Sequence, residues 1–362
     1  MTQTVLLVGT QKGLFRLEDT PDRTGWELAG PLIAGYEVLH AWLDPRDPQR
    51  GLAAVDHPVW GAHIYRTDDA GHRWEPLAGV PLHRPGLWPK RMKAVWHLAP
   101  GPAEAPGTVY AGTDPAGLFR SDDYGQSWTP VASLNEHPTR DTWEPARGGF
   151  SLHSILIDPQ SPQRLYVSIS AGGVFRSDDG GRSWRPCNEG VRAENLPGRC
   201  AVTGHNVHRT VLCPRRPERL YRQCYNGVYR SDDRGGHWTE ISSGLPSDFG
   251  YALATPPQDP DTVYVIPIES NHLRTCCDGR LRVYRSRDGG RHWAPLTRGL
   301  PQRHAYVTVL REAMAQDGAD PAGLYFGTSS GHLFASRDGG EHWETVAEFL
   351  PRVLSVQAAR CY

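Results

Sequence analysis

The sequence predicts an all-β protein, a seven-bladed β-propeller of four-stranded antiparallel blades. A nine-residue motif recurs six times and ends each time in tryptophan, and consecutive motif tryptophans are 54, 56, 54, 55 and 50 residues apart. A repeat of this length has room for four short strands with their turns, and such a period is typical of propellers. The 39 glycines and 31 prolines also interrupt the chain too often for long helices.

The repeated motif has the pattern Ser/Thr-x-Asp-x-Gly-x-x-Trp, and its chemistry is that of a tight turn. The aspartate accepts backbone N–H groups across the turn, the hydroxyl adds a further hydrogen bond, and the glycine permits a positive φ. The tryptophan then buries a large ring against the sheet. We therefore assign the motif carboxylates a structural role and not a catalytic one. They are Asp69, Asp123, Asp179, Asp233, Asp288 and Asp338.

This pattern is the Asp box, and the chain resembles the sialidase-like, glycosyl-hydrolase-like Asp-box (BNR-repeat) propellers over nearly its whole length. The resemblance implies that the boxes lie at the periphery of the ring and that binding takes place on the opposite face. It implies less about function, because Asp-box propellers serve as hydrolases, receptors and assembly factors.

The strands follow from the repeat. Trp26 lies 48 residues before Trp74 and marks a degenerate first unit, which begins at its second strand, Val5–Gly9. We expect Arg352–Val356 to supply the missing inner strand, which closes the ring as a single domain over 1–362 and leaves no open sheet edge. The other inner strands are expected at Val38–Leu43, Ala94–Ala99, Leu152–Ile157, Val207–Leu212, Tyr251–Ala254 and Tyr306–Leu310.

Composition excludes several classes of protein. The formal charge is -1, without the basic excess typical of nucleic-acid binders. No apolar run approaches the ~18 residues of a membrane span, and the N-terminus lacks a basic, cleavable leader, so we expect a cytoplasmic protein. The seven cysteines form no CxxC pair, which favours reduced thiols. The adjacent Cys276 and Cys277 leave a vicinal disulfide or thiol sensor open as an alternative.

Long segments before the third, fourth and fifth units carry many polar side chains, and long ordered loops on a rigid ring are often functional. Three carboxylates are candidate general acids or bases. Two come from these segments, and the third comes from the insertion after the second strand of the sixth unit. The candidate catalytic residues are Glu144, Glu194 and Glu269, and the candidate ligand-binding residues are His57, Trp88, Arg91, Arg147, Asn195 and His205.

Four consecutive inner strands each carry a histidine: His40, His97, His153 and His208, spaced by 57, 56 and 55 residues. Imidazoles converging on one channel could ligate a divalent metal such as Zn, Fe, Cu or Mn. Counted back from the proline that ends each strand, His153 and His208 share a register that the other two do not, and side chains alternate between the faces of a strand. This register favours His153 and His208 as ligands. The alternative is a set of hydrogen-bonded channel histidines.

We interpret the chain as an enzyme with a histidine-lined pocket at the channel mouth that acts on a small polar, anionic or sugar-like ligand, with or without a metal. It is not a typical sialidase, because the Tyr/Phe-Arg-Ile-Pro motif is replaced by Phe15-Arg-Leu-Glu18 and no arginine triad can be assigned. Two alternatives stay open: a binding or assembly scaffold with a protein partner, and a glycoside hydrolase that uses loop carboxylates. Neither a nucleic-acid partner nor a membrane partner is expected.

Overall fold

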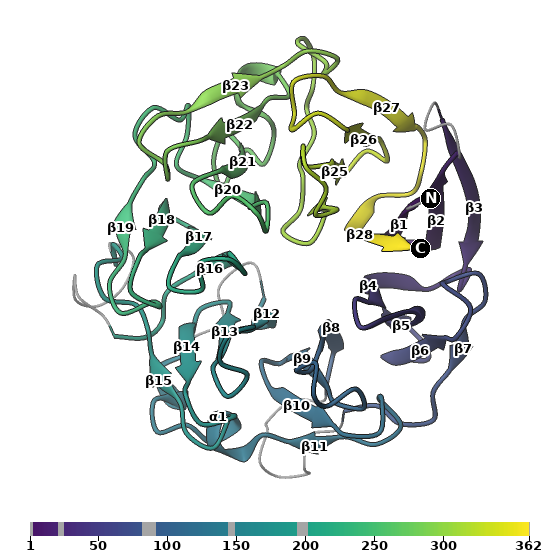
Figure 1. The fold of residues 1–362 in the computed structure, drawn as a ribbon, viewed down its shortest axis with the longest axis vertical. Helices are drawn as coiled ribbons and strands as arrows, with labels where there is room; N and C mark the ends of the chain where they lie inside the picture. Colours follow the sequence, from purple (N-terminus) through teal and green to yellow (C-terminus); the bar gives the residue numbers. More distant parts are fainter. Residues whose placement is uncertain (1–2, 21–24, 82–91, 144–148, 194–201, 362) are drawn as a thin grey trace.

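The computed structural model describes residues 3–20, 25–81, 92–143, 149–193 and 202–361. Seven four-stranded sheets stand around a central axis, and the strands within each sheet are antiparallel (Figure 1). The predicted seven-bladed propeller is therefore confirmed. The short helical turns α1 (Ala132–Asn135), η1 (Arg140–Thr142) and η2 (Cys277–Gly279) lie between strands, and no helix in the described part of the chain is long and apolar enough to span a membrane.

The first four blades begin with the one that joins the two ends of the chain. Blade 1 contains β28 (Val353–Cys361), β1 (Gln3–Thr10), β2 (Gly13–Asp19) and β3 (Trp26–Leu32). Blade 2 contains β4 (Glu37–Asp44), β5 (Asp47–Asp56), β6 (His63–Thr67) and β7 (Glu75–Pro76). Blade 3 contains β8 (Ala94–Pro100), β9 (Val109–Asp114), β10 (Leu118–Ser121) and β11 (Thr129–Pro130). Blade 4 contains β12 (Leu152–Ile157), β13 (Leu165–Ile169), β14 (Gly173–Ser177) and β15 (Arg185–Pro186).

The last three blades complete the ring in chain order. Blade 5 contains β16 (Val207–Leu212), β17 (Leu220–Cys224), β18 (Gly227–Ser231) and β19 (Thr239–Glu240). Blade 6 contains β20 (Gly250–Ala254), β21 (Val263–Pro267), β22 (Val283–Ser286) and β23 (Ala294–Leu296). Blade 7 contains β24 (Met314–Gln316), β25 (Leu324–Gly327), β26 (Leu333–Ser336) and β27 (Glu344–Ala347).

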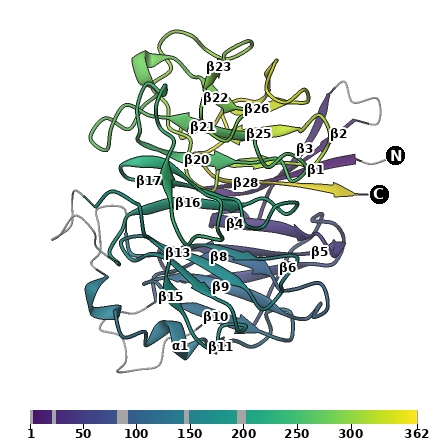
Figure 2. The same ribbon diagram turned by 60° about the vertical axis from the view of Figure 1, so that its left-hand side comes forward.

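The ring closes through the two ends of the chain, as the sequence predicts. Strand β28 is the inner strand of blade 1 and pairs antiparallel with β1, from Gln3 opposite Cys361 to Thr10 opposite Val353. The N- and C-terminal ends lie side by side in Figure 1 and Figure 2. Closure removes the open edge that an incomplete first blade would expose.

One predicted inner strand is wrong. Blade 7 uses Met314–Gln316 and not Tyr306–Leu310. The earlier segment is held by loop contacts instead: Cys276 N–H donates to the Val307 carbonyl at 3.0 Å, and Ser329 N–H donates to the Thr308 carbonyl at 2.8 Å. With its backbone groups satisfied by these loops, the segment does not enter the β24–β25 ladder.

The six boxes form the turn that their residue types predict. In each box the aspartate Oδ1 accepts the N–H of the residue four positions on, at 2.8–3.0 Å. The box hydroxyl donates to the same carboxylate and accepts the N–H of the box glycine. These glycines have φ between 79° and 91°, a region that disfavours residues with a Cβ. The structural role of the box aspartates is confirmed.

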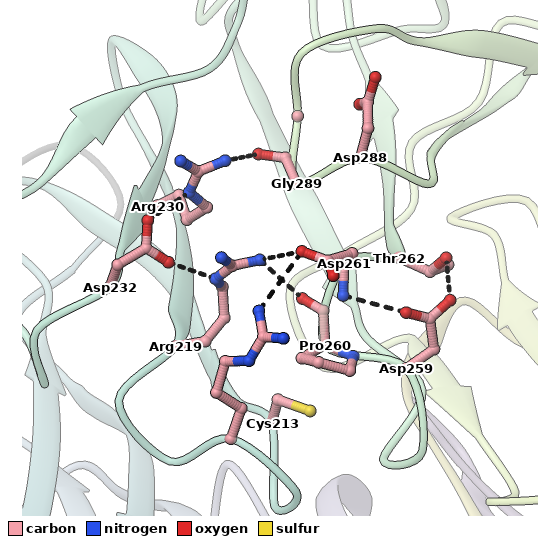
Figure 3. A network of polar contacts seen from close by, with 12 residues as sticks. Cys213, Arg219, Arg230, Asp232, Asp259, Pro260, Asp261, Thr262, Asp288 and Gly289 are labelled. Atoms are coloured by element: carbon pink, nitrogen blue, oxygen red, sulfur yellow. Dashed lines mark hydrogen bonds and ion pairs between the residues drawn. The ribbon is translucent and has the colours of Figure 1, made fainter.

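An arginine on the third strand of four blades ties each blade to its neighbour. In each case the guanidinium donates to the carbonyl of the residue that follows the aspartate position in the next box. Figure 3 shows one such contact, between Arg230 and Gly289 at 2.6 Å, beside Arg219, which pairs with Asp232 of its own blade and Asp261 of the next. The other three pairs are Arg16–Ala70, Arg176–Arg234 and Arg285–Gly339, each at 3.0 Å.

Three of the six box tryptophans and five of the six described cysteines are buried. Trp238 and Trp343 are each 1% exposed, and the indole N–H of Trp238 donates to the Cys187 carbonyl. The described cysteines are free thiols. Burial raises the pKa of both Cys276 and Cys277 to about 11, which keeps these thiols protonated and weakly nucleophilic at neutral pH.

Acid should weaken the boxes. Hydrogen bonds from Ser183 and its neighbours lower the pKa of Asp179 from 3.8 to about 2. Its ionised form therefore stabilises the fold above the unfolded pKa of ~3.9, and this contribution is lost as the pH falls toward 2. We expect Asp179→Ala to cost about 1 kcal/mol of unfolding free energy at pH 7 and less at pH 2.5, measured by urea unfolding. The exposed Asp141→Ala is the control, and an equal cost at both pH values would contradict the assignment.

Candidate functional site

A cavity of about 900 Å³ opens at the axis, on the face away from the Asp boxes. Its wall includes residues that begin the inner strands, such as Glu37 of β4 and Ala94 of β8, and residues that end the second strands, Asp56 of β5 and Asp114 of β9. We call it the mouth cavity. Its position agrees with the binding face that the resemblance implies.

Three carboxylates of the mouth cavity come from two adjacent blades. Glu37 and Asp56 are directly opposed on β4 and β5, an arrangement that places Cβ atoms ~4.5–5.5 Å apart. The Gln11 side chain donates to Glu37 at 3.5 Å. Asp114 ends β9, with the Lys93 ammonium 3.6 Å from its carboxylate. The cavity therefore holds a close carboxylate pair and a third carboxylate on the next blade.

The same wall carries cationic and aromatic groups. Arg274, Arg311 and Arg352 line the cavity together with Trp96 and Tyr251. The Arg311 guanidinium lies 5.8 Å from the Trp96 ring centroid. Polar groups of both signs beside aromatic faces suit a ligand with hydroxyl or acidic groups and a flat apolar side.

Below the mouth cavity, buried and half-buried polar side chains from five blades meet on the axis. We call these side chains the axial cluster, and they are His40, His97, Arg209, Glu312 and Gln357. Glu312 lies at its centre: Arg209 pairs with Oε2, His40 Nε2 lies 3.8 Å from Oε2, and His97 Nδ1 lies 3.6 Å from Oε1. The two imidazole centroids are 4.3 Å apart, and Gln357 Nε2 is 3.0 Å from His40 Nε2.

The axial cluster lies between two cavities. Glu312 lines the mouth cavity. A second cavity of about 290 Å³ is lined by His40, His97, Arg209 and Gln357, and by Pro100, which ends the inner strand β8. The cluster is therefore reached from the box side of the ring as well as from the mouth.

Burial and charge fix the protonation of the cluster. Burial, followed by the neighbouring His97, lowers the pKa of His40 well below 6.5, so its ring is neutral. Burial alone would raise the pKa of Glu312, but the charge of the Arg209 guanidinium, together with the adjacent His97 ring, outweighs burial and holds that pKa well below 4.5. The cluster thus combines an ionised carboxylate with a neutral imidazole.

The structure brings together two of the four predicted channel histidines. His40 and His97 meet in the axial cluster, although the proline register favours the other pair. His153 Nε2 contacts the Val207 carbonyl at 3.0 Å, and His208 Nδ1 contacts the Gly250 carbonyl at 2.7 Å. Burial lowers the pKa of His153 and His208, the latter to about 3. His153 and His208 therefore lie against neighbouring strands and outside the axial cluster.

β-Bulges explain this difference. The ladder register shifts at the same place in five inner strands: after Val38, Val95, Leu152, Val207 and Gly250. His153 and His208 are the extra residues of their bulges, whereas His40, His97 and Arg209 each follow one. An extra residue reverses the face on which later side chains lie, so counting back from the strand end selects the wrong histidines.

The remaining predicted residues are spread more widely. Glu269 is exposed at the start of the β21–β22 insertion and is not part of the mouth-cavity wall. His57 accepts the N–H groups of Val59 and Trp60, and its ring stacks on Trp60 at 6.2 Å. His205 is buried and bridges to Gly172. The other six lie outside the described residues: Glu144, Glu194, Trp88, Arg91, Arg147 and Asn195.

Sequence reasoning missed the central carboxylate. Glu312 lies just before β24, but with the inner strand expected at Tyr306–Leu310 it falls in a turn. The apolar residues Ala313–Ala315, followed by Asp317-Gly318, carry the usual signal of a strand that enters a turn. That signal would have placed Glu312 next to the axis. The repeat spacing indicates His208 and carries no signal for Arg209, the next residue along β16.

Comparison with known proteins adds a sequence and a structural likeness. The family model described as the BNR-Asp box repeat matches residues 118–131 and 228–241. The chain carries BNR-Asp box repeats. Its sequence is 29% identical over 294 residues to a xyloglucanase from Paenibacillus sp, covering 72% of this chain and 26% of that protein. It is 26% identical over 266 residues to xyloglucanase Xgh74A from Acetivibrio thermocellus, covering 62% of this chain and 28% of that protein.

The fold is also found among solved structures. The GH74 xyloglucanase from Xanthomonas campestris aligns with a TM-score of 0.64 at 19% identity, over 95% of this chain and 52% of that chain. The chain therefore spans about a quarter of the length of the curated relatives it matches, at 26% and 28%, and about half of this solved structure, at 52%.

Breaking the axial ion pair should strongly destabilise the ring. Glu312 is 2% exposed and Arg209 15%, and a buried charge left without its partner costs about 3–5 kcal/mol. We expect Arg209→Met to cost that much in urea unfolding, and Arg209→Met/Glu312→Gln to recover part of it. The surface pair Arg287–Glu341 provides the control, because Arg287→Met should cost less than about 1 kcal/mol. Equal costs for the two single variants would show that the axial pair is not effectively buried.

Proposed function

We propose that this chain is a glycoside hydrolase that binds an oligosaccharide in the mouth cavity. The observation that carries the proposal is the Glu37–Asp56 pair, two opposed carboxylates on the wall of a 900 Å³ cavity that also presents Trp96 and Tyr251. The sequence similarity to two xyloglucanases supports it and favours it over the scaffold alternative.

Glycosidic cleavage needs two carboxyl groups with different tasks. One protonates the leaving oxygen, and the other acts as nucleophile or activates water. Retaining enzymes use two carboxyl groups ~5–5.5 Å apart, and the direct opposition of Glu37 and Asp56 on neighbouring strands makes this pair the candidate for that work. In this proposal Asp114, one blade away, positions the sugar together with Lys93, whose ammonium is 3.6 Å from it. Trp96, which is only half-buried and lines the cavity, offers an aromatic face on which a sugar ring can stack.

Hydrolysis should therefore depend on the opposed pair. Glu37→Gln and Asp56→Asn should each lower kcat on xyloglucan oligosaccharides by about 10²–10⁴-fold, measured by the release of reducing ends. Glu104→Gln, which removes an exposed carboxylate in the hairpin between β8 and β9, should leave kcat unchanged. Glu269→Gln tests the exposed carboxylate that the sequence predicts.

Two results would contradict this assignment. Wild-type protein that cleaves neither neutral nor acidic oligosaccharides would overturn the hydrolase proposal. Cleavage that survives in Glu37→Gln and Asp56→Asn but is lost in Glu269→Gln would move the chemistry to the β21–β22 insertion. The anomeric configuration of the product adds a further check: retention agrees with the close pair, whereas inversion assigns one role to Asp114.

The cationic wall predicts a preference for acidic sugars. Arg274 and Arg352 are exposed and line the cavity, and a hydrogen bond from a guanidinium to a carboxylate contributes about 1.5–3 kcal/mol. We expect Arg274→Gln and Arg352→Gln to raise KM for a uronic-acid oligosaccharide by about tenfold or more, and to change KM for a neutral one little. Arg280→Gln, an exposed arginine outside the cavity wall, is the matched control. An equal rise for both substrates would exclude charge recognition by these arginines.

A further inference from the structure

The axial cluster contains an arrangement that the hydrolase proposal does not use. One nitrogen from His40, one from His97 and one carboxylate oxygen of Glu312 all lie within 4.8 Å of one another. These three side chains are 3%, 8% and 2% exposed. They come from three different blades, so the closed ring and not a local motif brings them together.

Three polar atoms of this cluster have no hydrogen-bond partner: His97 Nδ1, Glu312 Oε1 and Arg209 Nε. His97 Nδ1 and Glu312 Oε1 are fully buried and without a hydrogen bond, and they face one another at 3.6 Å. A buried polar atom without a partner costs about 1–3 kcal/mol. A single group that contacts both His97 Nδ1 and Glu312 Oε1 would therefore stabilise the structure. A cation between them would satisfy both.

We propose that His40, His97 and Glu312 bind a divalent first-row transition metal ion on the propeller axis. Two imidazoles with one carboxylate match the donor preferences of Zn²⁺, Fe²⁺ and Mn²⁺. Ca²⁺ and Mg²⁺ prefer all-oxygen sites and fit poorly. His40 Nε2 and His97 Nδ1 lie 3.8 Å and 3.6 Å from the Glu312 carboxylate, and metal bonds of 2.0–2.2 Å require donors ~3.4 Å apart. The three ligand atoms lie within 4.8 Å of one another, so metal binding would draw them closer together.

The surrounding side chains support the ligands. Arg209 pairs with Glu312 Oε2 and leaves Oε1 for the ion, and ligating carboxylates are commonly oriented by such a hydrogen bond. Neutral His40 and ionised Glu312 are the forms that bind metals. Gln357 Nε2 faces His40 Nε2 at 3.0 Å, and turning this amide over brings its oxygen toward the site as a further donor.

The site also has an entry path. His40 and His97 line the 290 Å³ cavity on the box side, so the positions not taken by protein ligands face that cavity. A metal with three protein ligands and an open position is typical of centres that act on a bound molecule, whereas closed four-ligand sites are structural. None of its three ligands belongs to the carboxylate pair in the mouth cavity.

The test is metal binding by the full chain. Protein freed of metal by a chelator is titrated with Co²⁺, whose visible absorption reports its ligands, and Zn²⁺ then competes for the site. We expect one equivalent to bind. His97→Ala should weaken binding by more than about 100-fold, because losing even an outer-shell partner costs 10–100-fold. His208→Gln and His57→Gln remove histidines outside the cluster and should bind as wild type, with circular dichroism confirming the fold of each variant.

Three outcomes would overturn the proposal. They are no Co²⁺ or Zn²⁺ binding by wild type at millimolar metal, unchanged affinity in His97→Ala, and loss of binding in His57→Gln alone. If His97→Ala does not fold, X-ray absorption of the zinc-loaded wild type decides. Two imidazoles with oxygen donors support the site, and thiolate ligands or four imidazoles exclude it. Because the readout is binding and not hydrolysis, this result is separate from that of the hydrolase proposal.

Discussion

Closure of the ring by β28 against β1 is the constraint on which the rest of the structure depends. The same strand that completes blade 1 brings Gln357 to His40 and donates the Val356 N–H to the Glu312 carbonyl. The first and last blades are thus joined through one strand, and the axial cluster can form only after that strand is in place. Asp boxes and inter-blade arginines then hold the periphery, so that the central side chains stay at fixed distances.

The repeated sequence motif makes most of the fold predictable, but it gives no signal where a blade departs from the pattern. The period of the box tryptophans predicts seven blades. It also predicts that the first unit lacks its inner strand and that residues near the C-terminal end supply that strand, because both follow from the number of residues available to each unit. The inner strand of blade 7 breaks the pattern: Tyr306–Leu310 has the apolar pattern of a strand, but its carbonyls are taken by Cys276 and Ser329. Competition between nearby backbone donors decides such a case, and residue spacing does not record it.

The candidate site was partly predictable because the blades repeat at a regular spacing. Spacing identifies four histidines on inner strands, but a bulge in each of these strands decides which face each histidine occupies. A bulge inserts one residue without any composition signal in these segments. Asp56 and Asp114 lie at the ends of second strands, and this position alone is enough to predict that they lie on the mouth side of the ring. Their opposition to Glu37 and the convergence on Glu312 depend on pairing between strands, which only the three-dimensional arrangement supplies.

Glu312 links the two proposed sites, because it lines the mouth cavity and also lies beside His40 and His97. An ion bound at its Oε1 would add positive charge beneath a wall that already carries Arg311 and Arg274. Charges held in a poorly hydrated interior are screened less by salt than surface charges are. A metal bound there would therefore strengthen the attraction of the mouth cavity for an acidic ligand without contacting that ligand. The electrostatic character of the cavity would then depend on a buried site below its surface.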